Sequence, residues 1–413
     1  MTVEKSVPEI RFKGFREEWE EKELGADVAD IIGGGTPSTA ISEFWDGDID
    51  WYSPTEIGKC IYANGSQKKI TAQGLEHSSA KILPAGNTVL FTSRAGIGDM
   101  AILTKSGATN QGFQSFVVKE GFSPYFLYSA GRQIKEFALK HASGSTFLEI
   151  SGKQLGRMKI VMPSEEEQTA IGNYFQKLDS LINQHQQKHD KLSNIKKAML
   201  EKMFPKEGKT VPEIRLKGFG GEWDEVKLGS IAKIKGRLGW KSLKQEEYLN
   251  YGPAMIAGKH IDKGIIKWKE VDHIPHWRYV ESPEIMLRNG DVIFSKDGSL
   301  GNPAIVSNLQ CEATINSTMM LVRPTSKLKP KFFYQVLQTK IFRDLIKEKV
   351  SGSSIPHLFQ ADMKLFTFKT PDPVEQEAIG SYFQKLDALI NHHQQQIAKL
   401  NNIKQSCLSK MFV

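Results

Sequence analysis

Two segments of the chain, residues 167–204 and 375–412, carry apolar side chains at the three- and four-residue spacing of a helix. In the first segment this stripe consists of Ile171, Phe175, Leu178, Ile182, Leu192, Ile195, Met199 and Met203. A proline, a serine and three glutamates at residues 163–167 are typical of a helix start. The pattern therefore predicts two long helices of 38 residues, each roughly 57 Å long at about 1.5 Å per residue.

The stripe is apolar at both ends of each predicted helix and polar in the middle, which is typical of an imperfect coiled coil. Two equal helices in one chain bury their stripes most simply against each other, and because the chain reverses between them we expect antiparallel packing. Unrelated helical hairpins, or helices that dimerise with a second chain, are the alternatives. The residues predicted to form the seam are Leu178, Ile182, Leu192, Ile195, Leu386, Ile390, Leu400 and Ile403.

Outside the two helical segments, short apolar runs are bounded by Gly, Pro, Asn and Asp, which favours β-strands and tight turns. Strands are expected at residues 88–93, 113–118, 291–295 and 318–322. One shorter helix is expected over residues 123–141, with a counterpart over residues 329–349. The mixture predicts α+β domains.

The chain contains an internal repeat. A leading segment at residues 7–25 returns at residues 211–229 with 13 of 19 positions identical, and the helical segment returns with 26 of 38 identical. The regions between them, residues 26–162 and 230–370, agree only in outline, as in GNTVLFTSRAGIG against GDVIFSKDGSLG. Two halves that do the same mechanical job on two different targets would show this contrast.

Composition narrows the class of protein. With 413 residues, 39% hydrophobic and 25% charged, the chain suits two globular domains. It contains no apolar run near the roughly 18–20 residues that span a bilayer and no signal-peptide core, so a cytoplasmic protein is expected. The net charge of +8 suits a polyanionic partner without requiring one. The three cysteines are too far apart in sequence to favour a disulfide framework or a zinc site.

A search for catalytic motifs gives none. The sequence Gly-Lys-Thr at 208–210 lacks the first glycine of a P-loop, and the glycines at 33–35 lack the spacing of a dinucleotide-binding loop. His185 and His189 have the spacing of a metal pair on a helix, but Ile397 replaces His189 in the second copy. We therefore expect no catalytic residue, metal or cofactor in this chain.

The features above belong together in one known family. Both helices begin with EQxAIGxYFQKLDxLI after Pro163 or Pro371, and LPAGNTVLFTSRAGIG and LRNGDVIFSKDGSLG occupy matching places in the two halves. On these residues, the whole chain resembles the specificity (S) subunit of type I restriction–modification enzymes. The resemblance implies two target-recognition domains that read a bipartite DNA sequence, joined by two long antiparallel helices as a coiled-coil spacer.

The resemblance also implies partners. Two methyltransferase (M) subunits would dock on the repeated helices, and restriction (R) subunits would join them. S-adenosylmethionine, ATP and magnesium would be bound by those subunits, because the S subunit itself catalyses nothing. The implied boundaries are 1–162 for the first target-recognition domain, 163–204 for the first helix, 205–229 for a linker with the repeated leading segment, 230–370 for the second target-recognition domain and 371–413 for the second helix.

Residues that could contact DNA are polar or basic loop residues, because base edges and phosphates are bound by such groups. In the first domain they are Thr36, Ser38, Lys59, Lys68, Lys69, Arg94, Asn110, Gln111 and Ser145. In the second domain they are Arg237, Lys241, Lys259, His260, Lys296, Asn302, Asn316, Ser353 and His357. Arg94 and Lys296 lie in matching glycine-rich loops. The alternative for each is a solvated surface side chain.

Two other functions stay open at this point. A coiled-coil scaffold could bind nucleic acid without sequence preference, although diverged loops beside repeated helices disfavour it. An enzyme with an unrecognised site is the third choice.

Overall fold

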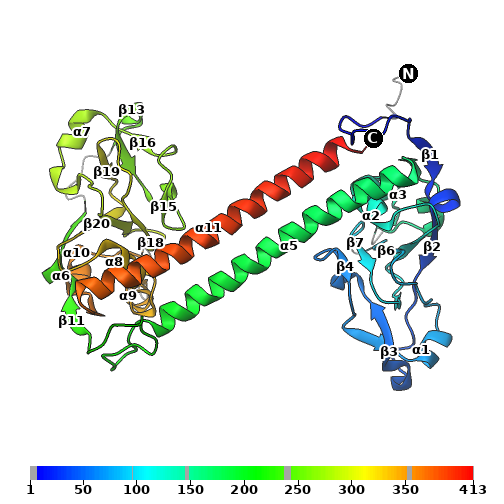
Figure 1. The fold of residues 1–413 in the computed structure, drawn as a ribbon, viewed down its shortest axis with the longest axis horizontal. Helices are drawn as coiled ribbons and strands as arrows, with labels where there is room; N and C mark the ends of the chain where they lie inside the picture. The colour runs from blue at the N-terminus through cyan, green and yellow to red at the C-terminus, as the bar shows by residue number, and fades with distance from the viewer. Residues whose placement is uncertain (1–6, 95, 145–147, 237–242, 351–355, 413) are drawn as a thin grey trace. The chain divides into compact units, whose positions relative to one another are not determined.

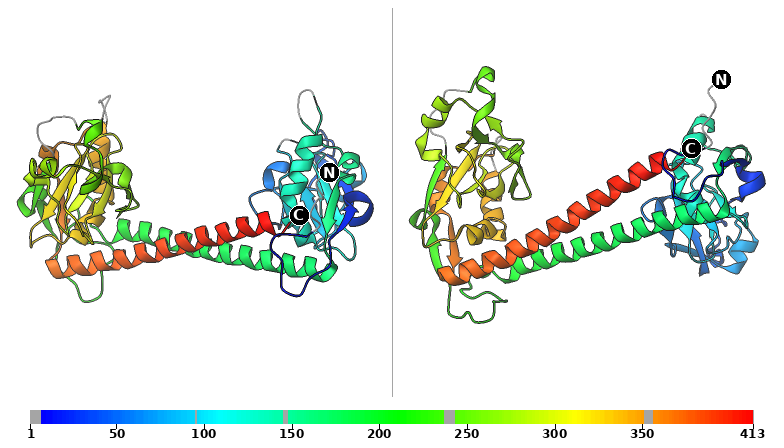
Figure 2. Two further views of the ribbon diagram at one scale, coloured as in Figure 1. Left: turned by 90° about the horizontal axis from the view of Figure 1, so that it is seen from above. Right: turned by 45° about the horizontal axis from the view of Figure 1, so that its top comes forward.

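The computed structural model describes residues 7–94, 96–144, 148–236, 243–350 and 356–412. Its contacts divide the chain into two units: residues 1–185 with 395–413 form unit 1, and residues 186–394 form unit 2. The long helices α5 (Glu165–Lys202) and α11 (Pro373–Lys410) each contribute a segment to both units. Figures 1 and 2 draw each of them as one uninterrupted helix.

Besides the strand pair β1 (Glu20–Glu23) and β10 (Lys159–Met162) described below, the described part of unit 1 contains a larger and a smaller sheet, with a hydrophobic core beside the larger one. The order of the larger sheet is β2 (Ala29–Gly33), β9 (Gln114–Val118), β6 (Thr88–Phe91), β7 (Met100–Leu103) and β4 (Tyr62–Ala63). The order of the smaller sheet is β5 (Lys68–Ile70), β3 (Trp45–Tyr52) and β8 (Gly107–Thr109), with β3 and β8 parallel.

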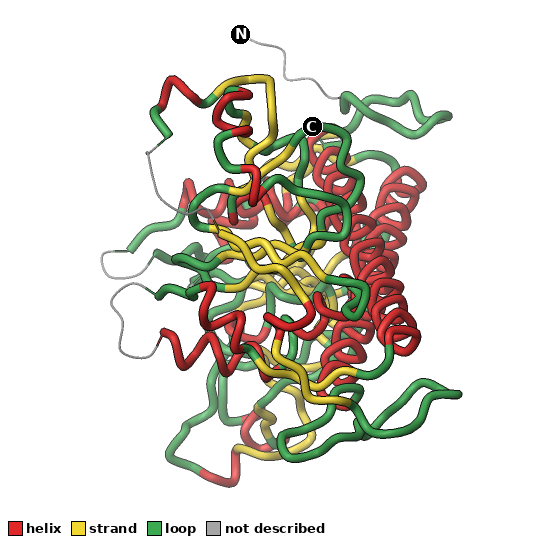
Figure 3. The backbone as a smooth tube through the Cα atoms, turned by 90° about the vertical axis from the view of Figure 1, so that its left-hand side faces the viewer, coloured by secondary structure: helices red, strands yellow, loops and turns green. Residues whose placement is uncertain are grey.

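Unit 2 repeats this arrangement although the sequence has diverged. Figure 3 draws the strands of the chain in yellow. The order of the larger sheet of unit 2 is β12 (Ala232–Gly236), β20 (Met319–Pro324), β17 (Val292–Ser295) and β18 (Gly301–Ile305). The smaller sheets are β16 (Asp272–His273), β13 (Leu249–Ile256) and β19 (Ala313–Ile315), and the hairpin of β14 (Ile261–Asp262) and β15 (Ile265–Ile266). The strands β6, β9, β17 and β20 confirm the four predicted strands.

Each predicted shorter helix is in fact two helices. Residues 123–141 form α2 (Pro124–Ser129) and α3 (Gly131–His141), and the counterpart forms α8 (Pro330–Val336) and α9 (Lys340–Val350). Ala130, between the two helices, has a ψ of 1°, outside the helical range. A Cβ on Gly131 would lie 2.7 Å from the sulfur of Met100 in β7. Residues of both helices pack in one core: Phe126 and Leu127 of α2, and Ile134 and Ala138 of α3.

The remaining elements are short. In unit 1 they are α1 (Ala72–Glu76), α4 (Gly152–Gly156), and the single turns Leu24–Val28, Ser42–Phe44 and Pro54–Glu56. In unit 2 they are α6 (Leu228–Ile231), α7 (His276–Val280), α10 (Gln360–Leu365), and the single turns Gln245–Glu247, Gly258–His260 and Pro283–Ile285.

The repeated leading segment closes each unit. Its strand β1 (Glu20–Glu23) pairs antiparallel with β10 (Lys159–Met162), the strand that runs into α5. In unit 2, β11 (Asp224–Lys227) pairs in the same way with β21 (Thr367–Thr370), which runs into α11. In each unit the repeated leading segment therefore lies beside the start of the repeated long helix.

A buried ion pair reinforces this junction. Nε and Nη2 of Arg11 donate to both carboxylate oxygens of Glu167 at 2.7 and 2.6 Å, and the indole of Trp19 donates to it at 3.2 Å. Arg215 makes the same two-point contact with Glu375, at 2.8 and 2.6 Å. Both carboxylates are fully buried in the first turns of the long helices. Such a geometry explains why the glutamate and the arginine occur in both copies.

The glutamine that follows each buried glutamate, Gln168 or Gln376, joins its long helix to the domain. The amide of Gln168 donates to the carbonyl of Pro163 at 2.9 Å and accepts from the backbone N–H of Ser123, before α2, at 3.1 Å. Gln376 likewise donates to the carbonyl before α11 and accepts from the backbone N–H of Lys329, before α8, at 2.8 Å. The repeated Glu-Gln pair thus has a local structural cause in both units.

The two long helices pack antiparallel within each unit, as predicted. In unit 1, Leu178 near the start of α5 shares a core with Leu400 and Ile403 near the end of α11. Unit 2 reverses the roles: Leu386 of α11 shares a core with Leu192 and Ile195 of α5. The remaining predicted seam residues, Ile182 and Ile390, are half-buried.

An ion pair joins the helices in each unit. Lys404 of α11 lies 2.6 Å from Asp179 of α5, and Lys196 of α5 lies 2.6 Å from Asp387 of α11. Asp179 and Asp387 occupy the same position of the repeat, as do the two lysines. The same contact therefore occurs in both units, but α5 supplies the aspartate in unit 1 and α11 supplies it in unit 2.

Replacing Arg11 with methionine should destabilise unit 1, because it leaves the buried Glu167 carboxylate without its cation. We expect the free energy of unfolding to fall by about 3 kcal/mol, measured by urea denaturation followed by tryptophan fluorescence. The matched control is Arg132→Met, whose pair with Glu136 is exposed and should give no measurable change. Equal stability of the two variants would contradict a structural role for the buried pair.

Candidate nucleic-acid interface

Four candidate contact residues of the first domain converge at the ends of β3, β6 and β8. The backbone N–H of Asn110 donates to the carbonyl of Tyr52, the last residue of β3, at 3.0 Å. The hydroxyl of Thr36 donates to the side chain of Gln111. Arg94 follows β6 and forms a bridge with Glu149, at 4.0 Å between their charged groups.

A second cluster lies at the equivalent strand ends of unit 2. The backbone N–H of Asn316 donates to the carbonyl of Ile256, the last residue of β13, at 3.0 Å. The Asn302 amide donates to the carbonyl of Ile261 at 3.0 Å. Lys296 follows β17, and Lys259 lies exposed in the turn after β13. Candidates far apart in sequence are thus neighbours on one edge of each domain.

Asn110 and Asn316 are equivalent in detail. The side-chain oxygen of Asn110 accepts from the backbone N–H of Gly112 at 2.8 Å, and that of Asn316 accepts from Thr318 at 3.1 Å. These turns orient the amide group without using its N–H donors, and asparagine amides can donate to base edges in the major groove. A donor of the same kind is therefore fixed at the same place in both domains.

The glycine-rich loops match, but Arg94 and Lys296 are not equivalent. The backbone N–H of Lys296 donates to Thr318 at 2.8 Å, whereas in unit 1 it is Ser93 that donates to the matching residue Gly112, also at 2.8 Å. Lys296 thus corresponds to Ser93, and Arg94 corresponds to Asp297. The second loop has one residue fewer before this point than the first, as GNTVLF against GDVIF shows. The sequence alone therefore does not show that Arg94 corresponds to Asp297.

The side-chain pair beside each loop is reversed between the two domains, because the acidic residue lies in the loop in one domain and is the partner that faces the loop in the other. Arg94 in the loop faces Glu149, whereas Asp297 in the loop faces His357, and both contacts are backbone bridges as well. Asp297 also lies 3.0 Å from the ammonium group of Lys296. Sequence reasoning missed both acidic partners, because no local pattern connects residues that are 55 or 60 positions apart.

Other candidates of the first domain lie on the smaller sheet and nearby loops. Lys68 and Lys69 are exposed on β5, with Lys68 over the ring of Trp45 at 5.8 Å and Lys69 3.7 Å from Asp50. Ser38 and Lys59 are exposed loop residues. All four lie on the surface, as a DNA contact requires.

His260 is placed differently from the other candidates, because the residue is only 2% exposed. Its Nδ1 accepts from the backbone N–H of Ala257 at 3.0 Å, and its Nε2 lies 3.6 Å from a carboxylate oxygen of Asp272. Burial lowers the pKa of the imidazole, and the charge of Asp272 only partly opposes this effect. The short turn Gly258–His260 directs the ring into the interior, where it cannot contact a base.

Four candidates lie outside the described residues: Ser145, Arg237, Lys241 and Ser353. They stay predictions.

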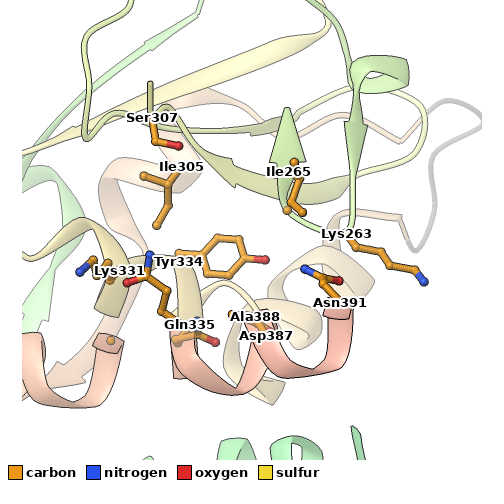
Figure 4. A pocket seen from close by; sticks show the side chains of 13 residues that line it. Lys263, Ile265, Ile305, Ser307, Lys331, Tyr334, Gln335, Asp387, Ala388 and Asn391 are labelled. Carbon is orange, nitrogen blue, oxygen red and sulfur yellow. The ribbon is translucent and has the colours of Figure 1, made fainter. Parts of the chain in front are cut away.

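A pocket of about 340 Å³ lies within unit 2, between the second domain and α11. Figure 4 shows the ring of Tyr334 between Ile305 of β18 and the α11 residues Asp387 and Ala388. Burial raises the pKa of Tyr334, and the charge of Asp387 adds to the shift.

Among the described residues, no group of three or more His, Cys, Asp or Glu side chains could hold a metal ion.

Comparison with known proteins identifies the family of this repeat. Residues 16–194 and 220–402 both match the type I restriction modification DNA specificity domain. The chain belongs to this family. The match confirms the resemblance found in the sequence, and it makes this chain a non-catalytic specificity subunit of a type I restriction–modification system.

Relatives of this specificity subunit support the assignment over the whole chain. The type I restriction enzyme MjaIX specificity subunit of Methanocaldococcus jannaschii is 28% identical over 406 residues, which cover 95% of this chain and 92% of the relative. The EcoR124I/EcoR124II specificity subunit of Escherichia coli is 34% identical over 183 residues, 42% of this chain and 44% of the relative.

A solved structure has the same fold. The crystal structure of the type I restriction–modification S subunit from M. genitalium aligns with a TM-score of 0.61 at 16% identity, covering 98% of this specificity subunit and 99% of that chain. None of the helices in the described ranges combines the length and apolarity needed to cross a membrane.

The burial of His260 predicts a pH dependence of stability. Because its folded pKa is lowered, the unfolded chain binds the proton more readily. The contribution to stability is complete above the unfolded pKa of about 6.5 and is lost as the pH falls below it. We expect the melting temperature to fall between pH 7.5 and 5.5 by more in the wild type than in His260→Asn. Parallel curves for the two proteins would contradict this assignment.

Proposed function

We propose that this specificity subunit reads a bipartite sequence in double-stranded DNA, one half with each target-recognition domain, and docks two methyltransferase subunits. The observation that carries the proposal is the equivalence of the two strand-end clusters. They have the same backbone hydrogen bonds, at Asn110 and Asn316, but different side chains beside them.

Two such clusters support a split target. Sequence discrimination comes from side chains at base edges, whereas the backbone only positions them. The two domains carry an arginine–glutamate pair and an aspartate–histidine pair at one equivalent position. Because these groups differ in charge and shape, the two domains would prefer different bases. The long helices α5 and α11 would serve as the spacer between the half-sites.

The repeated parts of the chain support two equivalent partners. The start of each long helix, with its buried ion pair and its glutamine, occurs once in each unit with nearly the same contacts. Because these buried contacts hold the helix start in the same way in both units, a partner that recognises its exposed side on one unit would find it again on the other. One S subunit could in this way hold two identical M subunits.

The chemistry would then belong to the partners. The M subunits would bind S-adenosylmethionine and methylate adenine, and R subunits with ATP and magnesium would join the assembly in the cytoplasm. We expect specific DNA binding only in the complex with M subunits, because the net charge of +8 over 413 residues is modest for an isolated DNA-binding protein.

Exchange of one domain tests the proposal. Residues 26–162 are replaced by the corresponding region of another specificity subunit, and the chimera is expressed with its methyltransferase. We expect one half of the methylated sequence to change, while the other half and the gap stay the same. The matched control exchanges residues 230–370 and should change only the opposite half.

Either of two results would contradict the two-reader proposal. One is a chimera that changes both halves at once. The other is a chimera that methylates the original sequence unchanged.

A further inference from the structure

An exposed aromatic ring lies beside the strand-end cluster of the second domain. Phe359 is 59% exposed, and its ring packs on the imidazole of His357 with 4.2 Å between the ring centroids. His357 contacts Asp297, which in turn lies 3.0 Å from the ammonium group of Lys296. The ring is thus held among charged side chains at the edge where the candidate contact residues meet.

The first domain has a serine at the same position. The backbone N–H of Ile150 donates to Ser93 at 3.1 Å, and that of Leu358 donates to Lys296 at 2.9 Å, so the two segments are in register. The next residue is Ser151 before α4 in the first domain and Phe359 before α10 in the second.

Serine suits this position better than phenylalanine as far as folding is concerned. The hydroxyl of Ser151 accepts from the backbone N–H of Gln154 at 3.2 Å and so caps α4. The side chain of Phe359 has no oxygen and makes no such cap for α10, although the backbone N–H of Phe359 donates to the carboxylate of Asp362 at 2.9 Å. An aromatic ring that is exposed and gives up a helix cap is unfavourable for stability, so its role should lie in binding.

The chemistry of the ring limits what it can contact. A phenyl group has no hydrogen-bond donor or acceptor, so it cannot read the polar pattern of a base edge. The apolar group that intact DNA displays in the major groove is the methyl group of thymine. We propose that Phe359 contacts a thymine methyl in the half-site bound by the second domain. This inference rests on the proposed function, because it needs a sequence-specific duplex at this edge.

The test uses the complex of this chain with its methyltransferase subunits and the mapped target duplex. Each thymine of the second half-site, on both strands, is replaced in turn by uracil, which lacks only the methyl group. Binding is measured by fluorescence anisotropy for the wild type, for Phe359→Ser and for Leu365→Ser. Leu365 is the control, because it is an apolar residue of α10 that is 66% exposed.

We expect one uracil substitution to weaken binding of the wild type by about fourfold, the effect of removing one buried methyl group. The Leu365→Ser complex should keep this sensitivity, and the Phe359→Ser complex should lose it. The Phe359→Ser protein should melt no lower than the wild type, because serine restores the helix cap.

Equal uracil sensitivity in the wild type and Phe359→Ser would overturn the inference, as would a second half-site without any A·T pair or without any sensitive thymine. The failure of the proposed function looks different. In that case the wild-type complex would bind the target duplex no better than a scrambled one.

Discussion

Glu167 and Glu375 are carboxylates without exposed surface, and a buried carboxylate is tolerated only when it is paired and hydrogen-bonded. In each unit the pairing arginine comes from the leading segment, about 160 residues before the helix. This requirement ties the beginning of the repeat to its end. The strand pairs β1–β10 and β11–β21 and the glutamine contacts at the helix starts then fix the domain on its helix.

This junction leaves the side chains at the strand ends of each domain free to vary. The strand ends are positioned by backbone hydrogen bonds, such as those of Asn110 and Asn316, which make few demands on the side chains beside them. An arginine can therefore be replaced by an aspartate, or a capping serine by a phenylalanine, while the strand order is retained. The proposed function needs this combination, because the two M subunits would be the same while the two half-sites of the DNA would differ.

The sequence predicted the features that depend on local patterns. The long helices, their antiparallel seam and four strands follow from the periodicity of apolar residues and from the repeat. The breaks between α2 and α3 and between α8 and α9 could not be predicted, because the apolar residues on both sides of each break keep the spacing of a helix.

The candidate site was predictable only in outline. Residue type and loop position indicated Thr36, Asn110, Gln111 and Asn316, which the structure brings to the strand ends. The same criteria included His260, because nothing in the surrounding sequence shows that its ring turns inward. The acidic partners and Phe359 were not recognised, because their significance depends on long-range contacts and on a comparison of equivalent backbone positions.

The most direct test of the account is to map methylated adenines in host DNA by single-molecule sequencing, with this chain expressed beside its methyltransferase and with it deleted. The account predicts a motif of two short sequences separated by a fixed gap, which disappears when the chain is deleted. A continuous motif, or methylation that is unchanged by the deletion, would contradict it.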